Sequence, residues 1–285
     1  MKMKINSWFL AAVMFICGNV SVNAQEVYFT TQQLPDLIKC LPAPPAFDSP
    51  EFANDMMRYV WGKQQRLNPE RANIAKGDAV WNYDSLFYQF RVPFGIEVKE
   101  STTPEIYKLL VTALSTTDQM RVEPKAFYLR QRPFERFNDK MLTDEEDELR
   151  GEGSYPSGHT MRGWTCALLM AEIAPQHADT IFARGWMYGE SRVIVGAHWQ
   201  SDVDASRVAA SIGYVALQGS PAFREQMQKA QAEYAEKTGE TVGVHSAQVI
   251  QHPAAKARTY TLSGATATNV SRGVVIQDHQ KVVRK

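Results

Sequence analysis

Residues 153–175 read GSYPSGHTMRGWTCALLMAEIAP, and this stretch decides the fold. Its second half is rich in apolar residues, which predicts a buried helix over 160–174, and the closing proline cannot continue that helix. Ser157 stands just before the helix as a candidate N-cap, and Gly158 lets a ligand come close to the backbone. Because the first N–H groups of a helix have no partners within it, we expect an anion-binding site at this end.

Two further clusters of polar residues flank this helix in the sequence. Six residues separate Lys125 from Arg132, and five separate Arg192 from His198, with Asp202 four positions later. Lysine and arginine bind phosphate oxygens, arginine through a fork of two donors. On one helix, His198 and Asp202 would share a face, because residues four apart do. The carboxylate would then hold one imidazole nitrogen protonated and leave the other free to attack.

Taken separately, these clusters have plainer explanations. A lysine and an arginine at this spacing usually lie on a solvated surface, Ser-Gly-His can be an ordinary turn, and His198 can simply hydrogen-bond Asp202. His159, His198 and Asp202 are also residue types that ligate metals, yet no further cluster of histidines or cysteines completes such a site. Together they supply positive charge, a nucleophile and, in His159, a second imidazole for acid catalysis. Phosphoryl transfer needs these components.

The combination resembles the three-part pattern of the type 2 phosphatidic acid phosphatase (PAP2) superfamily, Lys-x6-Arg-Pro, Pro-Ser-Gly-His and Ser-Arg-x5-His-x3-Asp. The matching residues are Lys125, Arg132, Pro133, Pro156, Ser157, Gly158, His159, Ser191, Arg192, His198 and Asp202. The longer stretch 153–160 is similar to the signature of the class A bacterial non-specific acid phosphatases. This resemblance covers about residues 30–235. It implies an all-α, compact helical bundle with acid phosphatase activity toward phosphate monoesters.

The resemblance also implies a role for each motif residue. His198 would be the nucleophile that forms a phosphohistidine, His159 the acid that protonates the leaving oxygen, and Asp202 the residue that orients His198. The phosphate-binding residues would be Lys125, Arg132, Ser157, Gly158 and Arg192. The family uses no metal ion and no other cofactor. The expected partners are small phosphate esters, namely nucleotides and sugar and aryl phosphates, with a phosphotransferase side activity left open.

Other members of the superfamily use the same pocket differently. Lipid phosphatases generally cross the membrane several times, but beyond the N-terminal region no segment reaches the roughly 18 consecutive apolar residues of a membrane helix. Vanadium-dependent haloperoxidases hold vanadate in place of phosphate, and here the chain size and the class A stretch favour the phosphatase. A phosphate-binding scaffold without activity would not need two histidines. An apyrase-like preference for nucleoside di- and triphosphates stays open, as does the formation of homo-oligomers.

The remainder of the core is expected to be helical. Apolar residues recur at helical spacing, and few stretches alternate with a period of two. Thr103 is a candidate N-cap, with Pro104 at the favoured first helical position. The tryptophans after residue 60 are expected in the core rather than against substrate. After an extended proline-rich segment at 34–50, the predicted helices cover 49–66, 70–90, a stretch from Thr103, 177–188 and 198–217.

The two ends of the chain differ from this core. Residues 1–24 have the layout of a secretory signal peptide, with Lys2 and Lys4 before an apolar run and small residues at its end. The run is too short to cross a bilayer of roughly 30 Å. We therefore expect cleavage, a periplasmic location, and a helical acid phosphatase domain over 25–240.

Residues 241–285 are predicted to form a tail that is either disordered or a small strand-rich sorting segment. The tail is rich in Gly, Thr, Ser and Lys with scattered valines. The blocks at 260–264 and 272–276, followed by a basic end, resemble the last strands of type IX C-terminal sorting domains. That alternative would place the protein at the cell surface or in the medium.

The charge and the cysteines of the chain bear on its possible ligands and on disulfide formation. The formal net charge is zero, whereas a protein that binds nucleic acid needs a basic surplus for its phosphate contacts. The acidic run at 144–148 is expected either to be solvated or to border the pocket mouth and repel polyanionic substrates. Whether Cys40 and Cys166 form a disulfide is left open, because sequence does not give their geometry.

Overall fold

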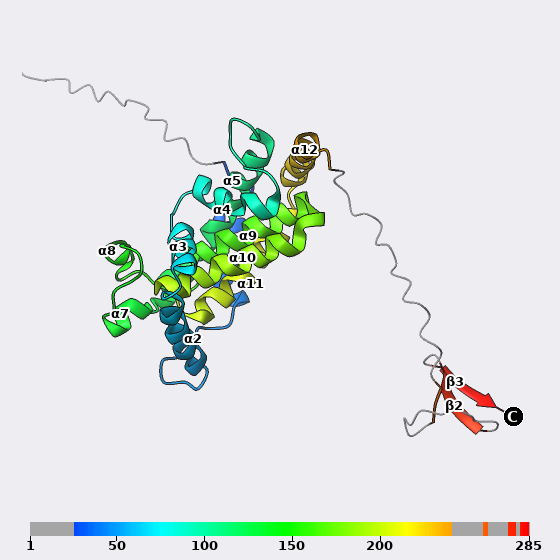
Figure 1. Cartoon of the computed structure of the whole chain (residues 1–285), viewed down its shortest axis with the longest axis horizontal. Helices are drawn as coiled ribbons and strands as arrows, with labels where there is room; N and C mark the ends of the chain where they lie inside the picture. Colours follow the sequence, from blue (N-terminus) through cyan, green and yellow to red (C-terminus); the bar gives the residue numbers. More distant parts are fainter. Residues whose placement is uncertain (1–25, 241–258, 262–272, 278–279, 285) are drawn as a thin grey trace, which may run out of the picture. The chain divides into compact units, whose positions relative to one another are not determined.

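The computed structural model describes residues 26–240, 259–261, 273–277 and 280–284, and it divides the chain into two units after Val242 (Figure 1). The first unit is helical. Its α-helices are α1 (Leu37–Cys40), α2 (Phe52–Gln65), α3 (Pro69–Asp78), α4 (Tyr83–Phe94), α5 (Pro104–Asp118), α6 (Val122–Tyr128), α7 (Pro133–Phe137), α8 (Glu146–Leu149), α9 (Gly158–Ile173), α10 (Ala178–Val195), α11 (Gln200–Gln218) and α12 (Pro221–Thr238). Its 3-10 helices are η1 (Thr31–Gln33), η2 (Gln119–Arg121) and η3 (Pro175–His177).

Helix α9 is the centre of this unit, as the apolar stretch after Ser-Gly-His predicts. It packs against α10, α11 and α5, and Figure 1 shows α9, α10 and α11 alongside one another. A helix with apolar residues on all sides is stable only when other elements cover all its sides. The largest core cluster includes Phe87, Phe90, Phe94, Leu109, Leu110, Leu169, Met170, Ile181, Phe223 and Tyr234. The predicted all-α, compact helical architecture is confirmed for the described part of this unit.

The predicted helix over 70–90 is in fact two helices. Helix α3 ends at Asp78, and α4 begins at Tyr83. Asn82 stands between them with an extended backbone, and its side-chain oxygen accepts a hydrogen bond from the backbone N–H of Ser85 at 2.7 Å. An asparagine in this N-cap position starts a new helix rather than continuing the old one. The break matters because it places Trp81 beside the cavity described below.

The predicted N-cap at Thr103 is also only partly right. Thr103 does occupy the N-cap position of α5, but its hydroxyl oxygen accepts from the Lys99 N–H at 2.9 Å. The side chain therefore closes the preceding turn. The free N–H of Ile106 is satisfied instead by a carboxylate oxygen of Glu233 at 2.8 Å. Glu233 lies on α12, a helix that the sequence analysis did not predict, so this end of α5 is capped through tertiary packing.

The two cysteines among the described residues are free thiols. Cys40 is exposed at the end of α1, whereas Cys166 is buried in the middle of α9, so the two do not pair. Within the described ranges no helix combines the length and the apolar character needed to cross a membrane. The expected signal peptide lies outside the described residues.

The described residues of the C-terminal unit form a small antiparallel sheet. Its strands are β1 (Thr259–Thr261), β2 (Gly273–Gln277) and β3 (Gln280–Arg284), in the order β1-β2-β3. Thr259 pairs with Gln277, and Gly273 pairs with Arg284. A function of this unit in sorting stays a prediction.

The central packing predicts that replacing two nearby residues of α4 affects stability very differently. Phe90 is fully buried in the core cluster, whereas Val92 is 77% exposed. We expect Phe90→Ala to lower the free energy of unfolding by about 3–5 kcal/mol through lost burial and a cavity. Val92→Ala should change it by less than about 0.5 kcal/mol. Denaturant unfolding followed by circular dichroism measures both values, and similar losses for the two variants would contradict the packing described here.

Candidate active site

The three polar clusters of the sequence meet around one cavity of about 240 Å³. Motif residues that line it are Lys125, Arg132, Gly158, His159 and His198. Ser157, Arg192 and Asp202 lie directly behind these side chains, through the contacts described below. The remaining residues of the lining, which the motifs do not include, are Trp81, Arg121, Glu145, Glu148, Leu149 and Glu152.

The first cluster places two cations at the cavity, the buried Arg132 and the partly buried Lys125. Lys125 lies on α6, and its ammonium group donates to the carbonyl of Gly153 at 2.6 Å. Arg132 is the N-cap residue of α7 and only 1% exposed. Its guanidinium donates to backbone carbonyls, including those of Leu149 at 3.1 Å and Ala197 at 3.1 Å. These neutral acceptors hold the cations in place without cancelling their charge.

Crowding of positive charge changes the acidity of both cations. Burial, followed by the nearby charges of Arg132 and Arg121, lowers the pKa of Lys125 well below its usual value. Burial and then the charge of Arg192 lower the pKa of Arg132 to about 10. Like charges that converge in a buried site cost free energy unless an anion joins them. The arrangement therefore favours a bound anion.

The second cluster forms the N-terminus of α9. Ser157 is the N-cap residue, as predicted, and its hydroxyl oxygen accepts from the Thr160 N–H at 3.3 Å. Among the described residues, the N–H groups of Gly158 and His159 have no hydrogen-bond partner. A Cβ atom on Gly158 would lie 2.9 Å from Cδ of Arg121, so glycine is needed for this close approach. The helix end offers two free donors to an anion.

His159 is fixed by a backbone carbonyl and an aromatic ring. Its Nε2 lies 2.9 Å from the carbonyl oxygen of Ala79, at the end of α3. Because a carbonyl only accepts, Nε2 carries a proton, and Nδ1 is the nitrogen left for other chemistry. The indole ring of Trp81 lies 4.5 Å from the imidazole, between centroids, and Trp81 is 44% exposed. The expectation of a core position for Trp81 is thus wrong, because the break after α3 brings it to the cavity wall.

The third cluster spans the end of α10, the turn that carries His198, and the start of α11. Helix α10 continues through Arg192 to Val195, and Gly196, at φ 86°, turns the chain. The predicted helix over 198–217 starts only at Gln200, so His198 precedes it and the expected shared helical face is wrong. The turn still places Nδ1 of His198 3.4 Å from a carboxylate oxygen of Asp202.

The other imidazole nitrogen of His198 faces the cations. Its Nε2 lies 3.1 Å from a guanidinium nitrogen of Arg132, which is a donor, so Nε2 is the unprotonated nitrogen and its lone pair accepts this hydrogen bond. Burial, followed by the charges of Arg132 and Lys125, lowers the pKa of His198 well below its usual value. Burial and then Arg192 do the same for His159. Both imidazoles are therefore predominantly neutral at neutral pH.

Arg192 is fully buried behind the cavity and meets the acidic run. Both of its terminal nitrogens donate to the carboxylate of Glu145, at 3.0 and 3.2 Å. Asp144 is exposed, but Glu145 and Glu148 line the cavity. Of the two expectations for this run, the one that places it at the pocket mouth is therefore right for these two glutamates.

Ser191, the serine of the third motif, does not line the cavity and instead positions a neighbouring segment. The Ser191 hydroxyl donates to a carboxylate oxygen of Asp78 at 2.6 Å. Asp78 is fully buried, is paired with Arg184, and directly precedes Ala79, whose carbonyl holds His159. Ser191 therefore ties the end of α10 to the segment that orients His159.

Two further functional residues were missed by the sequence analysis. Arg130 donates to a carboxylate oxygen of Asp202 at 2.5 Å and to one of Asp55 at 2.8 Å. Asp55 in turn accepts from the backbone N–H of Ser201 at 2.7 Å, at the start of α11. The signal for Arg130 was its place inside the Lys-x6-Arg motif. Asp55 lies on α2, and no motif in the sequence around it indicates a role at the site.

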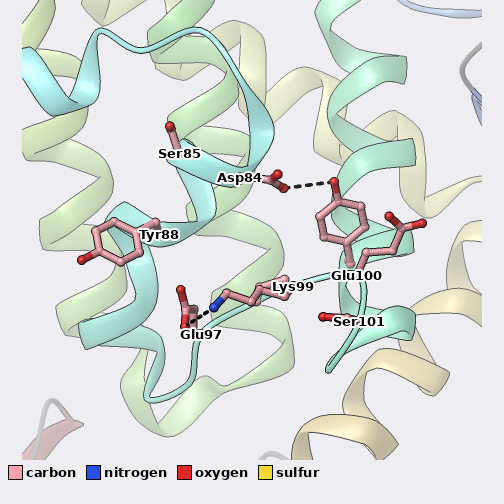
Figure 2. A pocket seen from close by; sticks show the side chains of 9 residues that line it. Asp84, Ser85, Tyr88, Glu97, Lys99, Glu100 and Ser101 are labelled. Atoms are coloured by element: carbon pink, nitrogen blue, oxygen red, sulfur yellow. Dashed lines mark hydrogen bonds and ion pairs between the residues drawn. The ribbon is translucent and has the colours of Figure 1, made fainter.

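A larger groove of about 700 Å³ lies elsewhere, along α4 and the segment before α5 (Figure 2). It contains none of the motif residues, and its charged side chains include Asp84, Glu97 and Glu100. Lys99, its cation, is paired with Glu97 at 2.9 Å. This groove is larger than the cavity at the motif residues, but its negative charge disfavours an anionic ligand. The smaller cavity is the better candidate.

The chain is similar to several known proteins. Residues 106–224 match the family described as the PAP2 superfamily. The chain is 39% identical over 220 residues to a non-specific acid phosphatase of Providencia stuartii, which covers 76% of this chain and 88% of that protein. It is 37% identical to a non-specific acid phosphatase of Salmonella typhimurium, over 69% of this chain and 79% of the relative. It is 35% identical to an acid phosphatase of Zymomonas mobilis, over 70% of this chain and 75% of that protein.

The contacts of Arg130 predict a large loss of stability when it is replaced. Arg130→Met leaves the buried carboxylates of Asp55 and Asp202 without their cation, so we expect a loss of about 3–5 kcal/mol. The matched control is Arg150→Met, which alters an exposed arginine and should cost less than about 1 kcal/mol. Denaturant unfolding measures both. Equal losses would mean that Arg130 does not hold Asp202 in place.

Proposed function

The chain belongs to the PAP2 superfamily, and from this premise we propose that it is an acid phosphatase that hydrolyses phosphate monoesters through a phosphohistidine at His198. One observation carries the proposal. Nε2 of His198 is the unprotonated imidazole nitrogen and lies 3.1 Å from a donor nitrogen of Arg132, with Asp202 behind the opposite nitrogen. A nucleophile, cations and a second imidazole are the components of phosphoryl transfer.

Binding of the phosphate group is the first step. Its oxygens would accept from Lys125, Arg132 and Arg192, and from the free N–H groups at the start of α9. Ser157 contributes by capping that helix, and Gly158 by letting the backbone come close. In a buried cavity such fixed donors stabilise the charge of the five-coordinate phosphorus more strongly than water does.

Two transfers then follow. Nε2 of His198 attacks phosphorus while the ester oxygen leaves, and protonated His159 gives its Nδ1 proton to that oxygen. Asp202 stabilises the positive charge that forms on His198. In the second transfer, neutral His159 takes a proton from water, the water oxygen attacks phosphorus, and the bond to His198 breaks. Free phosphate and the starting enzyme result.

To act as the acid, His159 must be protonated, but its buried and cationic surroundings disfavour the protonated form. Burial and Arg192 lower the pKa of its imidazole. A bound phosphate carries negative charge next to it, which raises that pKa again. We infer that His159 takes up its proton with the substrate, and that activity is greatest at acid pH.

Three other parts of the proposal concern substrate range, metal independence and location. Glu145, Glu148 and Glu152 in the cavity wall disfavour highly charged di- and triphosphates, so monoesters are the better substrates. A broad range of leaving groups and metal independence come from the resemblance. The periplasmic location depends on the expected signal peptide.

Replacement of His198 and replacement of His159 are expected to affect turnover differently. His198→Ala removes the nucleophile, so turnover of every substrate should fall by about four orders of magnitude. His159→Asn removes only the leaving-group proton. Because p-nitrophenolate leaves without that proton and an alkoxide does not, turnover of p-nitrophenyl phosphate should fall at least about tenfold less than that of an alkyl phosphate. Steady-state kinetics on both substrates checks this.

The control is His177→Asn, which alters a histidine outside the cavity, beside Glu240, and should leave turnover unchanged. Equal losses on both substrates for His159→Asn would show that His159 is not the acid.

Metal independence is tested by chelation. Three cationic side chains supply the positive charge that a metal ion would supply, so full activity should persist in excess chelator. The measurement is turnover of p-nitrophenyl phosphate before and after dialysis against chelator. Activity that is lost and then restored by one divalent ion would refute this part of the mechanism.

A further inference from the structure

The ion pair between Glu145 and Arg192 is an unusual feature of a phosphate site. The carboxylate takes both terminal nitrogens of Arg192, the guanidinium expected to hold phosphate. Arg192 is fully buried, and within the described part of the chain its Nε has no hydrogen-bond partner. The guanidinium is thus held by one carboxylate, with a donor still unsatisfied.

The charge of the empty site explains why a carboxylate is there. Lys125, Arg132 and Arg192 converge, and their mutual repulsion contributes to the lowered pKa values of Lys125 and Arg132. Glu145 supplies negative charge from within the chain. A phosphate dianion brings more charge and more acceptor oxygens, so it is the stronger partner for the same donors.

The segment that carries Glu145 is anchored at its ends and partly exposed between them. Met141 is buried, and the Leu142 N–H donates to the carbonyl of Val195 at 3.1 Å. At the other end, Leu149 packs against a core cluster. Between these anchors Asp144 and Asp147 are exposed, and α8 is a single turn. Movement of Glu145 therefore requires no rearrangement of the core.

We propose that Glu145 is an internal competitor of phosphate, which occupies Arg192 in the empty site and returns to it when product leaves. This inference rests on the proposed function. Substrate binding displaces the carboxylate into the solvent-exposed mouth. Because only the fraction of molecules with a free Arg192 binds phosphate tightly, the competitor weakens binding of both substrate and product. After hydrolysis, the returning carboxylate replaces phosphate on Arg192 and speeds release from a strongly cationic site.

The test compares inhibition by inorganic phosphate in four full-length proteins: wild type, Glu145→Gln, Glu145→Ala and the control Asp147→Asn. Asp147→Asn removes the same charge from the same turn at an exposed position outside the cavity lining. We expect the inhibition constant of phosphate to fall about tenfold in Glu145→Gln and further in Glu145→Ala. KM for p-nitrophenyl phosphate should fall with it, and Asp147→Asn should match wild type.

Three results would overturn the proposal. An inhibition constant that rises in Glu145→Gln would mean that Glu145 positions Arg192 for phosphate. An unchanged constant would mean that the carboxylate does not compete. An equal fall in Asp147→Asn would assign the effect to the general negative charge of the segment.

A measurement on the wild type avoids any folding defect of the variants. Hydrogen exchange of residues 143–149 should become faster when phosphate is added, because the ion pair that holds the segment is broken. Slower or unchanged exchange would contradict displacement. If the wild type binds phosphate with this response but hydrolyses no monoester, the proposed function fails and the competitor stands.

Discussion

The structure depends on the convergence of Lys125, Arg132 and Arg192 in a largely buried space. Three cations so close together repel one another, and burial removes the water that would screen them. The chain meets this constraint with neutral backbone acceptors, such as Gly153 and Ala197, and with the carboxylate of Glu145. The same repulsion favours the binding of phosphate, because a bound anion reduces it.

The fold supplies the rigidity that this constraint requires. Helix α9, buried among α5, α10 and α11, directs its N-terminus at the cavity, which Gly158 and His159 line. His198 sits on a tight turn and is backed by Asp202, which Arg130 and Asp55 connect to α2. Catalytic side chains thus gain their orientation from helix ends and ion pairs rather than from mobile loops.

The sequence predicted those parts that depend on local pattern. The apolar run after Ser157 predicted α9, and the fixed motif spacings predicted which side chains gather at the cavity. The break after α3 escaped prediction because a helical pattern continues through it and a single N-cap, Asn82, decides the boundary. Asp55 escaped because its meeting with Asp202 through Arg130 is a tertiary contact between distant helices. For the acidic run, the sequence favoured solvation, with the pocket mouth as the alternative, and the structure places Glu145 and Glu148 at the cavity.

The central claim is that Nε2 of His198 carries the phosphoryl group during turnover. The most direct test is rapid quenching of the full-length enzyme with a phosphate monoester, followed by peptide mapping in alkali, which preserves phosphohistidine. The mechanism predicts one phosphorylated peptide, with the phosphoryl group on Nε2 of His198, that forms and decays at rates compatible with turnover. A phosphoryl group on another residue, or turnover with no trapped intermediate and inversion at phosphorus, would contradict it.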